Sequence, residues 1–558
     1  MAILEMKDVS FSYPDKTLAL QHISIQIEPG ECTVIGGASG SGKSTLLRML
    51  KREVQPVGLV TGEILYDGIP LQHQDLSRMA QEVAMIFQDP ENQIVMDEVW
   101  QELAFGLENL GYSSAVIRKR VAEIVSFFGL EELLHRKTYE LSGGQKQMVN
   151  LAAVLLMQPK VLLLDEPTSQ LDPIAAREFL QMVKRLNEEL GMTVILVEHR
   201  LEDVFALGDR VILMDSGCIH YEGTVQQAID QVWRAQDCLF LPYLPTISQL
   251  YLTVQKGSGM IPTSVKEGRQ WLQREILDCF SKPQGLKESS TSSQEEAITT
   301  LLQLKNIDFR YQRDGKPILT SLNLSLYEND FFVVVGGNGA GKTTMLQVAA
   351  GLLKPLSGMV KLQDKKLAKI PPKERYQIIG YLAQNPKLYF VHDTVAAELQ
   401  HVIQNHGLDI SKYELDELIS RLGIHHLLEK HPYDCSGGEQ QKIALAGVLL
   451  GKPKILLIDE PTKGLDPISK KEFAEILNGL RQNGVSILMV THDIEFAASY
   501  ATRCAMLFNG EIISEDKPGP FFKGNFFYTT VLNRIFREHL PSAITYEEVL
   551  AQWHVPTS

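Results

Sequence analysis

The chain has 558 residues, too many for one hydrophobic core, so two or more domains are expected. Its formal net charge of −14 lacks the basic surplus that nucleic-acid-binding proteins usually show, which disfavours a DNA or ribosome partner. No apolar run reaches the length of a membrane span, the N-terminus lacks a secretion-signal pattern, and the six cysteines form no CxxC pair, so a cytosolic protein without zinc or disulfides is expected.

The first motif in chain order is the glycine-rich loop GASGSGKS at 37–44, which follows a strand-like run and precedes a helical pattern. In this context the backbone N–H groups curl around phosphate oxygens, and the helix adds its positive N-terminal end. We expect Lys43 to reach the β and γ phosphates and the Ser44 hydroxyl to bind Mg²⁺. The predicted nucleotide-binding residues here are Gly37, Ala38, Ser39, Gly40, Ser41, Gly42, Lys43, Ser44 and Thr45.

Two residues outside the loop are candidates for the same site. Tyr13 can stack on adenine, and packing at a strand edge is the alternative. Gln88, in IFQDPENQ, is expected to contact Mg²⁺ or the attacking water and to report the nucleotide state to a neighbouring protein; the alternative is an ordinary surface glutamine.

The segment LSGGQ at 141–145 predicts a second phosphate-binding helix start. Ser142 is a good N-cap, and Gly143 and Gly144 expose the backbone at the first turn. A domain with its own phosphate loop has no use for a second one. We therefore expect Ser142, Gly143 and Gly144 to serve a nucleotide that another domain holds.

An apolar run, VLLL at 161–164, predicts a strand buried on both faces, and it ends in Asp165 and Glu166. We expect Asp165 to lie close to Mg²⁺ and Glu166 to polarise the attacking water. His199 ends a second such strand and is expected to contact the γ-phosphate. The alternatives are a solvated acidic strand end and a packed histidine.

Every one of these motifs recurs in the same order in the second half, and the two loop lysines lie 299 residues apart. Ordered matches of this kind indicate a duplicated domain. Two halves that face head to tail can each lend the LSGGQ-type helix to the other's loop. The second set is Tyr311, Gly336, Gly337, Asn338, Gly339, Ala340, Gly341, Lys342, Thr343, Thr344, Gln384, Ser436, Gly437, Gly438, Asp459, Glu460 and His492.

The domain boundaries follow from composition and from the last motif of each half. A Ser-, Thr- and Glu-rich stretch predicts a flexible tether. Each half also ends in a tail of Pro, Ser/Thr and an acidic helical segment, which we interpret as a small helical appendage; unrelated surface helices are the alternative. The expected domains are 1–235, 236–280 (appendage), 281–300 (tether), 301–520 and 521–558 (appendage).

These motifs together resemble the ATP-binding cassette (ABC) superfamily over about 220 residues of each half. The resemblance implies an α/β fold of two tandem P-loop NTPase cassettes, each a mostly parallel sheet with an antiparallel β subdomain and a helical subdomain. The segments 11–15, 87–93 and 97–111 resemble the ATPases of energy-coupling factor (ECF) importers. The fused form and its tails are similar to the hydroxymethylpyrimidine/thiamine type.

The resemblance implies an ATPase on the cytoplasmic face of the membrane that drives uptake of a vitamin or a transition-metal ion. Its cofactors would be ATP and Mg²⁺, and its partners a transmembrane coupling subunit and a substrate-binding membrane subunit. It would contact neither nucleic acid nor cargo, and its two cassettes would pair within one chain without a homodimer. The implied metal ligands are Ser44, Gln88 and Asp165 in one site and Thr343, Gln384 and Asp459 in the other.

The chain departs from the family pattern in three places, all in the second half. Cys435 replaces Leu and Glu439 replaces Gln in the signature, and the segment after Gln384 lacks the PENQ of the first half. Because Glu439 would lie near a polyphosphate, it is expected to weaken the first site modestly. No catalytic group is deleted, so we expect both sites to hydrolyse ATP and allow for unequal rates.

Other classes remain alternatives on sequence alone. A twin-cassette protein on ribosomes would need a basic or helical linker, and a fused sugar or peptide importer usually has one degenerate half. A chromosome ATPase would place long coiled coils between loop and signature, and a scaffold would lose Glu166 or Glu460. The segment 94–106 is a candidate for the groove that receives the membrane partner; packing on its own subdomain is the other interpretation.

Overall fold

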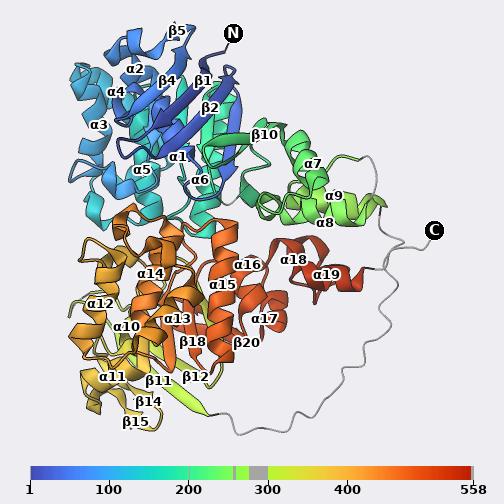
Figure 1. Cartoon of the computed structure of the whole chain (residues 1–558). Coiled ribbons are helices and arrows are strands. Elements are labelled where there is room, and N and C mark those ends of the chain that lie inside the picture. The colour runs from blue at the N-terminus through green and yellow to red at the C-terminus, as the bar shows by residue number, and fades with distance from the viewer. Residues whose placement is uncertain (1, 200, 256–258, 276–298, 314, 554–558) are drawn as a thin grey trace. The chain divides into compact units, whose positions relative to one another are not determined.

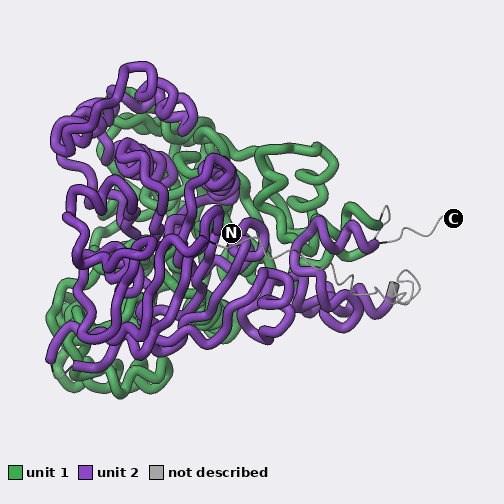
Figure 2. The backbone as a smooth tube through the Cα atoms, turned by 90° about the horizontal axis from the view of Figure 1, so that it is seen from below, with its two compact units in different colours: residues 1–264 green, residues 265–558 purple. Residues whose placement is uncertain are grey.

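The computed structural model describes residues 2–199, 201–255, 259–275, 299–313 and 315–553. Most of the predicted tether, and parts of the predicted first appendage, lie outside these residues. The chain forms two compact units, residues 1–264 and 265–558, shown in two colours in Figure 2.

Unit 1 contains the strands and helices that Figure 1 labels from β1 to α8. Its strands are β1 (Leu4–Ser12), β2 (Leu18–Ile27), β3 (Cys32–Gly37), β4 (Leu59–Tyr66), β5 (Ile69–Pro70), β6 (Val83–Ile86), β7 (Val161–Asp165), β8 (Thr193–Val197), β9 (Arg210–Asp215) and β10 (Cys218–Thr224). Its helices are α1 (Lys43–Met49), α2 (Leu76–Glu82), α3 (Val99–Asn109), α4 (Ser114–Phe128), α5 (Gly143–Leu155), α6 (Pro173–Leu190), α7 (Val225–Ala235) and α8 (Thr246–Val254).

Unit 2 begins with helix α9, which precedes the second cassette in the chain, and then largely repeats the order of unit 1. Its strands are β11 (Thr300–Phe309), β12 (Leu319–Tyr327), β13 (Phe331–Val335), β14 (Ser357–Leu362), β15 (Lys365–Lys366), β16 (Ile379–Leu382), β17 (Ile455–Asp459), β18 (Ser486–Thr491), β19 (Arg503–Phe508) and β20 (Glu511–Asp516). Its helices are α9 (Val265–Glu275), α10 (Lys342–Ala350), α11 (Pro372–Ile378), α12 (Val395–His406), α13 (Lys412–Leu422), α14 (Gly437–Leu449), α15 (Pro467–Gln482), α16 (Ile494–Tyr500), α17 (Pro518–Gly524), α18 (Val531–Phe536) and α19 (Tyr546–Gln552).

The main sheet of each unit is mostly parallel, which confirms the predicted fold class. Its order is β10-β9-β3-β8-β7-β6 in unit 1 and β20-β19-β13-β18-β17-β16 in unit 2, so equivalent strands hold equivalent places. Only the last hairpin, β9–β10 or β19–β20, pairs antiparallel. The central strands β7, β8, β17 and β18 are buried throughout, as expected for strands covered on both faces.

The core of unit 2 divides on the two faces of this sheet. In β13, Phe331, Val333 and Val335 join the hydrophobic cluster that includes α14 and α15. Their neighbours Phe332 and Val334 join the cluster of α10 and of the antiparallel sheet β12-β11-β14-β15. Successive side chains of a strand point to opposite faces, and the apolar run therefore holds the phosphate-loop strand between two cores.

The helical subdomain of unit 1 consists of α3, α4 and the start of α5. In α3, Val99, Leu103 and Leu107 are buried in one cluster with Val121 and Val149. The segment 94–106 therefore packs on its own subdomain, as one of its two interpretations expected.

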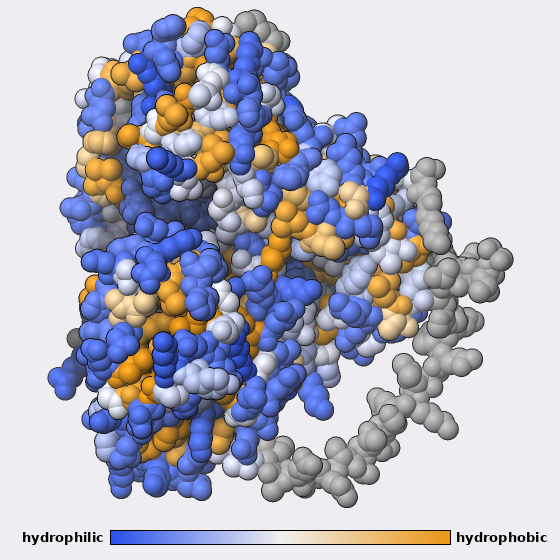
Figure 3. All heavy atoms as spheres, in the orientation of Figure 1, coloured by the Kyte–Doolittle hydropathy of each residue, from blue (hydrophilic) through white to orange (hydrophobic). Residues whose placement is uncertain are grey.

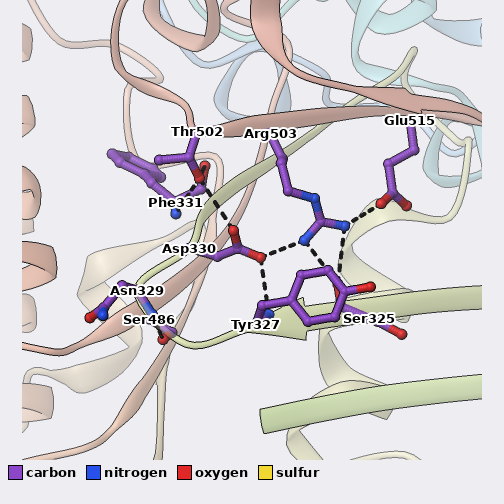
Figure 4. A network of polar contacts seen from close by, with 9 residues as sticks. All are labelled: Ser325, Tyr327, Asn329, Asp330, Phe331, Ser486, Thr502, Arg503 and Glu515. Atoms are coloured by element: carbon purple, nitrogen blue, oxygen red, sulfur yellow. Dashed lines mark hydrogen bonds and ion pairs between the residues drawn. The ribbon is translucent and has the colours of Figure 1, made fainter. Parts of the chain in front are cut away.

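A polar network closes unit 2 at the amino ends of its parallel strands (Figure 4). The Arg503 guanidinium at the start of β19 pairs with Asp330 at 2.5 Å and also with Glu515 on β20. The same guanidinium lies over the rings of Tyr327 and Phe332. Asp330 also accepts a hydrogen bond from the Tyr327 N–H at 3.0 Å. The network ties the β12–β13 turn to the edge hairpin, at the end of the sheet opposite the phosphate loop.

The predicted first appendage, 236–280, is divided between the units. Helix α8 packs in unit 1, whereas α9 packs in unit 2 against α18. Arg269 on α9 donates to the backbone carbonyl of Arg534 at 2.9 Å, and the Trp271 ring stacks on Trp553 with centroids 5.7 Å apart. The sequence did not reveal this exchange because it depends on tertiary packing.

Among the described residues, no helix combines the length and the apolar character that crossing a bilayer requires.

Candidate nucleotide-binding sites

Each glycine-rich loop lies between a buried strand and a helix, as predicted. Gly42 and Gly341, which immediately precede α1 and α10, have φ of +97° and +100°. A Cβ atom at Gly42 would come within 2.4 Å of the Ala19 carbonyl oxygen, so only glycine fits this close approach. The loop lysines lie inside the curl: Lys43 donates to the Gly37 carbonyl at 2.9 Å, and Lys342 donates to the Gly336 carbonyl at 2.8 Å.

A hydroxyl and a carboxylate meet beside each loop. The Ser44 hydroxyl donates to Asp165 Oδ1 at 2.7 Å. Burial raises the pKa of Asp165 to about 6, and burial raises that of Asp459 to about 6 while the Thr343 hydroxyl opposes the shift. Asp459 Oδ1 is buried and has no hydrogen-bond partner among the described residues. An oxygen-rich, underpaired site of this kind fits Mg²⁺, which prefers carboxylate and hydroxyl ligands.

The predicted catalytic carboxylates share an uncommon backbone conformation. Glu166 and Glu460 follow β7 and β17 with φ of +46° and +47°. Residues other than glycine rarely adopt positive φ, and such strain gathers at functional sites. Both side chains are buried.

Glu166 is held by two other predicted site residues of its own unit. His199 Nε2 lies 2.7 Å from one carboxylate oxygen, and the Gln88 side-chain amide donates to the other at 2.6 Å. The structure thus brings Gln88, Glu166 and His199 together, although they are far apart in the sequence.

Glu460 is held differently. His492 Nδ1 lies 2.7 Å from one oxygen and Lys342 Nζ lies 3.2 Å from the other. Burial would raise the pKa of Glu460, but the charges of His492 and Lys342 outweigh it and lower the pKa to about 2. No bond from Gln384 to Glu460 is present within the described part of unit 2, in contrast to the bond from Gln88 to Glu166.

The two tyrosines lie beside the loop helices. The Tyr13 hydroxyl is 3.0 Å from Thr45 Oγ1, and the Tyr311 hydroxyl is 3.1 Å from Thr344 Oγ1. The Tyr311 side chain is 62% exposed, which leaves its ring accessible. Stacking on adenine stays a prediction.

Both signature segments start helices with a capping box. Ser142 Oγ accepts from the Gln145 N–H at 3.3 Å, and Gln145 Oε1 accepts from the Ser142 N–H at 3.0 Å. In unit 2, Glu439 Oε2 accepts from the Ser436 N–H at 2.7 Å and so takes the place of Gln145. The departure Gln to Glu therefore keeps the helix start of Ser436, Gly437 and Gly438 intact.

Three buried glutamates were not predicted from the sequence, one beside a site histidine and two on helices. Glu198 is buried next to His199 and accepts from both the N–H and the hydroxyl of Thr168, at 3.0 and 2.7 Å. Glu102 on α3 accepts from the N–H groups of Val95 and Met96, at 2.9 and 2.7 Å, and Glu398 on α12 binds the equivalent loop in unit 2. A glutamate within an otherwise apolar helix face was the available signal.

Fold and site together define the class: each unit is a P-loop nucleotide-binding domain in which a buried glutamate follows the strand-end aspartate. The model of the ABC transporter family matches residues 20–169 and 319–463, and an AAA domain model matches residues 431–498.

Relatives match along nearly the whole chain. A protein of Bacillus thuringiensis, provisionally named an ABC transporter ATP-binding protein, is 46% identical over 98% of both chains. A Bacillus subtilis protein, provisionally named for HMP/thiamine import, is 32% identical over 93% of this chain and 92% of its own. A solved cbiO1 structure from Clostridium perfringens is 35% identical, covers 41% of this chain and 94% of its own, and has a TM-score of 0.38. The chain belongs to the ABC transporter family, as an ATPase with two ATP-binding cassettes in tandem.

Proposed function

We propose that the chain is the energy-coupling ATPase of an ECF-type importer, for a vitamin precursor such as hydroxymethylpyrimidine or thiamine, or for a transition-metal ion. The observation that carries this proposal is the Bacillus subtilis relative named for HMP/thiamine import, which aligns over 93% of this chain. The ECF-like segments of the first cassette and the duplicated tails support it.

Within each cassette we propose the same division of work. Ser44, Gln88 and Asp165, or Thr343, Gln384 and Asp459, would hold Mg²⁺, which would neutralise phosphate charge when bound. Glu166 or Glu460 polarises the attacking water, because a carboxylate fixed by two neighbours cannot rotate away from it. His199 or His492 contacts the γ-phosphate and holds the carboxylate.

We further propose that the ATP sites are shared between cassettes. Each cassette carries two helix starts suited to phosphate, one that begins at its loop lysine and one capped by Ser142 or Ser436. The second start serves the nucleotide of the other cassette, so that ATP favours the closed pair and hydrolysis releases it. This pairing lies within one chain, so no homodimer is required, and no nucleic acid is involved.

The membrane partner requires a docking surface, and unit 2 has a suitable groove of about 570 Å³. Tyr389 and Phe390, in the segment after Gln384, form part of its wall, and residues of α11, α12, α14, β16 and the end of α10 line most of the rest. Apolar residues gather over this part of unit 2 in Figure 3, where Figure 1 labels α10, α12 and α14. We propose that a short amphipathic helix of the transmembrane subunit docks here, so that the ATPase sits at the cytoplasmic face of the membrane.

Co-purification tests the assignment. The chain is expressed with its native membrane neighbours, purified in detergent, and screened by thermal shift with vitamins and metal ions. We expect recovery with a transmembrane subunit and a small-substrate-binding membrane subunit, and stabilisation of the complex by one vitamin or metal ion. Recovery with ribosomes, or with a sugar- or peptide-specific permease, would overturn the ECF assignment.

A further inference from the structure

Each half of the chain joins its tail to its catalytic centre by the same short route. Glu202 lies three residues after His199, and its carboxylate accepts from the Thr246 N–H at 2.8 Å and from the Thr246 hydroxyl at 3.1 Å. Thr246 is the first residue of the tail helix α8.

Unit 2 makes the equivalent contact. Glu495 lies three residues after His492, and its carboxylate accepts from the N–H of Val531 at 2.7 Å. Val531 is the first residue of the tail helix α18. The chain between carboxylate and helix start differs in length, 44 residues in one half and 36 in the other, so the contact is kept although the connection is not.

The two tails also share an internal arrangement beyond this contact. Two residues into each helix, a polar side chain reaches the backbone of a later proline. Ser248 Oγ donates to the Pro262 carbonyl at 2.6 Å, and Asn533 Nδ2 donates to the Pro541 carbonyl at 3.3 Å. Ile247 and Leu532, beside the attached residues, are buried. Each tail is thus a packed element with a fixed start.

The attached carboxylates are close in sequence to the catalytic groups. His199 and His492 each lie 2.7 Å from the catalytic carboxylate of their own unit. The first N–H of a helix has no partner within the helix, so a carboxylate bound to it fixes where the helix begins. A shift of α8 or α18 would therefore act on a carboxylate that lies three residues along the chain from the histidine.

Unit 2 has a second contact between tail and site. The Tyr528 hydroxyl lies 3.6 Å from the position that a Cβ atom on Gly337 would occupy, in the phosphate loop. The Tyr528 ring packs against the core cluster that contains Phe331 and Phe496. The tail of unit 2 therefore lies beside the phosphate loop and also bonds to Glu495.

We propose that Glu202 and Glu495 are positioning residues for ATP hydrolysis, through which the seating of α8 and α18 sets the orientation of His199 and His492 toward Glu166 and Glu460. The tails thereby act on turnover in their own cassette. This inference rests on the catalytic role proposed above for the two histidines.

Steady-state ATPase assays on the full chain test it. We expect the Glu202→Ala/Glu495→Ala double variant to lose kcat about tenfold with KM for ATP within about twofold, since misplacing a catalytic group by a fraction of an ångström costs rate more than binding. The Glu202→Gln/Glu495→Gln variant keeps an acceptor oxygen and should retain at least about half of kcat. The Asp203→Ala/Glu547→Ala variant, which removes two exposed carboxylates of the same regions, is the matched control.

A second double variant, in contrast, removes the groups that donate to Glu202 and Glu495. Proline is favoured at the first position of a helix and lacks an N–H, so Thr246→Pro/Val531→Pro should leave the tail helices formed and the melting temperature nearly unchanged. It should reproduce the loss of kcat. A kcat within twofold of wild type for both the alanine and the proline variants, or equal losses for alanine and glutamine, would overturn the inference.

The histidine variants separate this inference from the function beneath it. If His199→Ala/His492→Ala keeps the wild-type kcat, the catalytic role proposed for the histidines fails. If that variant is inactive while the alanine and proline variants keep full kcat, only the role of Glu202 and Glu495 fails.

Discussion

The two cassettes fold alike but hold the buried glutamates Glu166 and Glu460 differently. In the first, Gln88 and His199 bind Glu166, and the loop lysine Lys43 donates to the carbonyls of Gly37 and Ala38. In the second, Lys342 and His492 bind Glu460. A duplicated fold therefore conserves the place of each group and still permits two charge arrangements around the same chemistry.

The aspartates should show no such difference, and they give the largest expected effects. Because burial raises the pKa of Asp165 and of Asp459 to about 6, each charge opposes folding at neutral pH. Without nucleotide, Asp165→Asn and Asp459→Asn should each raise stability by about 2–3 kcal/mol. Both should lose stabilisation by Mg-ATP, which differential scanning calorimetry with and without ligand measures. A rise in stability for only one of the two variants would show that the two aspartates lie in different electrostatic environments.

Lys342 should contribute more to the stability of its unit than Lys43 does. Lys342→Met leaves the buried Glu460 with His492 alone, and loss of one partner of a buried ion pair costs about 2 kcal/mol or more. Lys43→Met removes the donations to the Gly37 and Ala38 carbonyls, while Gln88 and His199 still bind Glu166. Chemical denaturation of the two variants, followed by probes in each unit, should show the larger loss in unit 2. Equal losses of stability in the two variants would mean that the Lys342–Glu460 ion pair does not stabilise unit 2.

The two units also differ at Glu198, because Thr491 takes its place in unit 2. Burial raises the pKa of Glu198 to about 7, although Thr168 opposes the shift. The folded state thus binds a proton that the unfolded state has released, and this stability is lost as the pH rises through 7. Relative to Glu198→Gln, the wild type should lose about 1 kcal/mol between pH 6 and pH 8. If the free energies of unfolding of the wild type and Glu198→Gln change equally with pH, the pKa of Glu198 is not raised.

Glu439 should matter least. Its carboxylate fills the capping position of Gln145, so Glu439→Gln should change stability by less than about 0.5 kcal/mol. The modest weakening of the first site expected from the sequence predicts an ATPase gain of no more than about twofold in this variant. A larger gain would show that the charge of Glu439 reaches the bound phosphates.

The sequence predicted the groups at the carboxyl ends of the strands because their positions follow from local pattern. A buried strand that ends in Asp165 and Glu166 must place both side chains at the edge where the phosphate loop also lies. The partners of Glu166 and Glu460 could not be predicted in this way. Gln88 and Gln384 hold equivalent places in the sequence, but within the described residues only Gln88 bonds to the glutamate of its unit.

Contacts that depend on distant packing were likewise invisible. Glu202 and Glu495 look like ordinary surface residues of short helices until the tails fold back onto them. Helix α9 reads as part of the first tail, yet Trp271 stacks on Trp553 at the other end of the chain. The sequence indicated that the tails were helical but carried no signal for their partners.

Single-turnover phosphate release distinguishes whether Glu166 and Glu460 both act in hydrolysis despite their different partners. Glu166→Gln and Glu460→Gln chains are loaded with Mg-ATP, and the phosphate released per chain is counted in the first turnover. We predict that each single variant still releases phosphate from its intact site and that the double variant releases none. Full release by Glu166→Gln together with none by Glu460→Gln would show that Glu460 alone is catalytic.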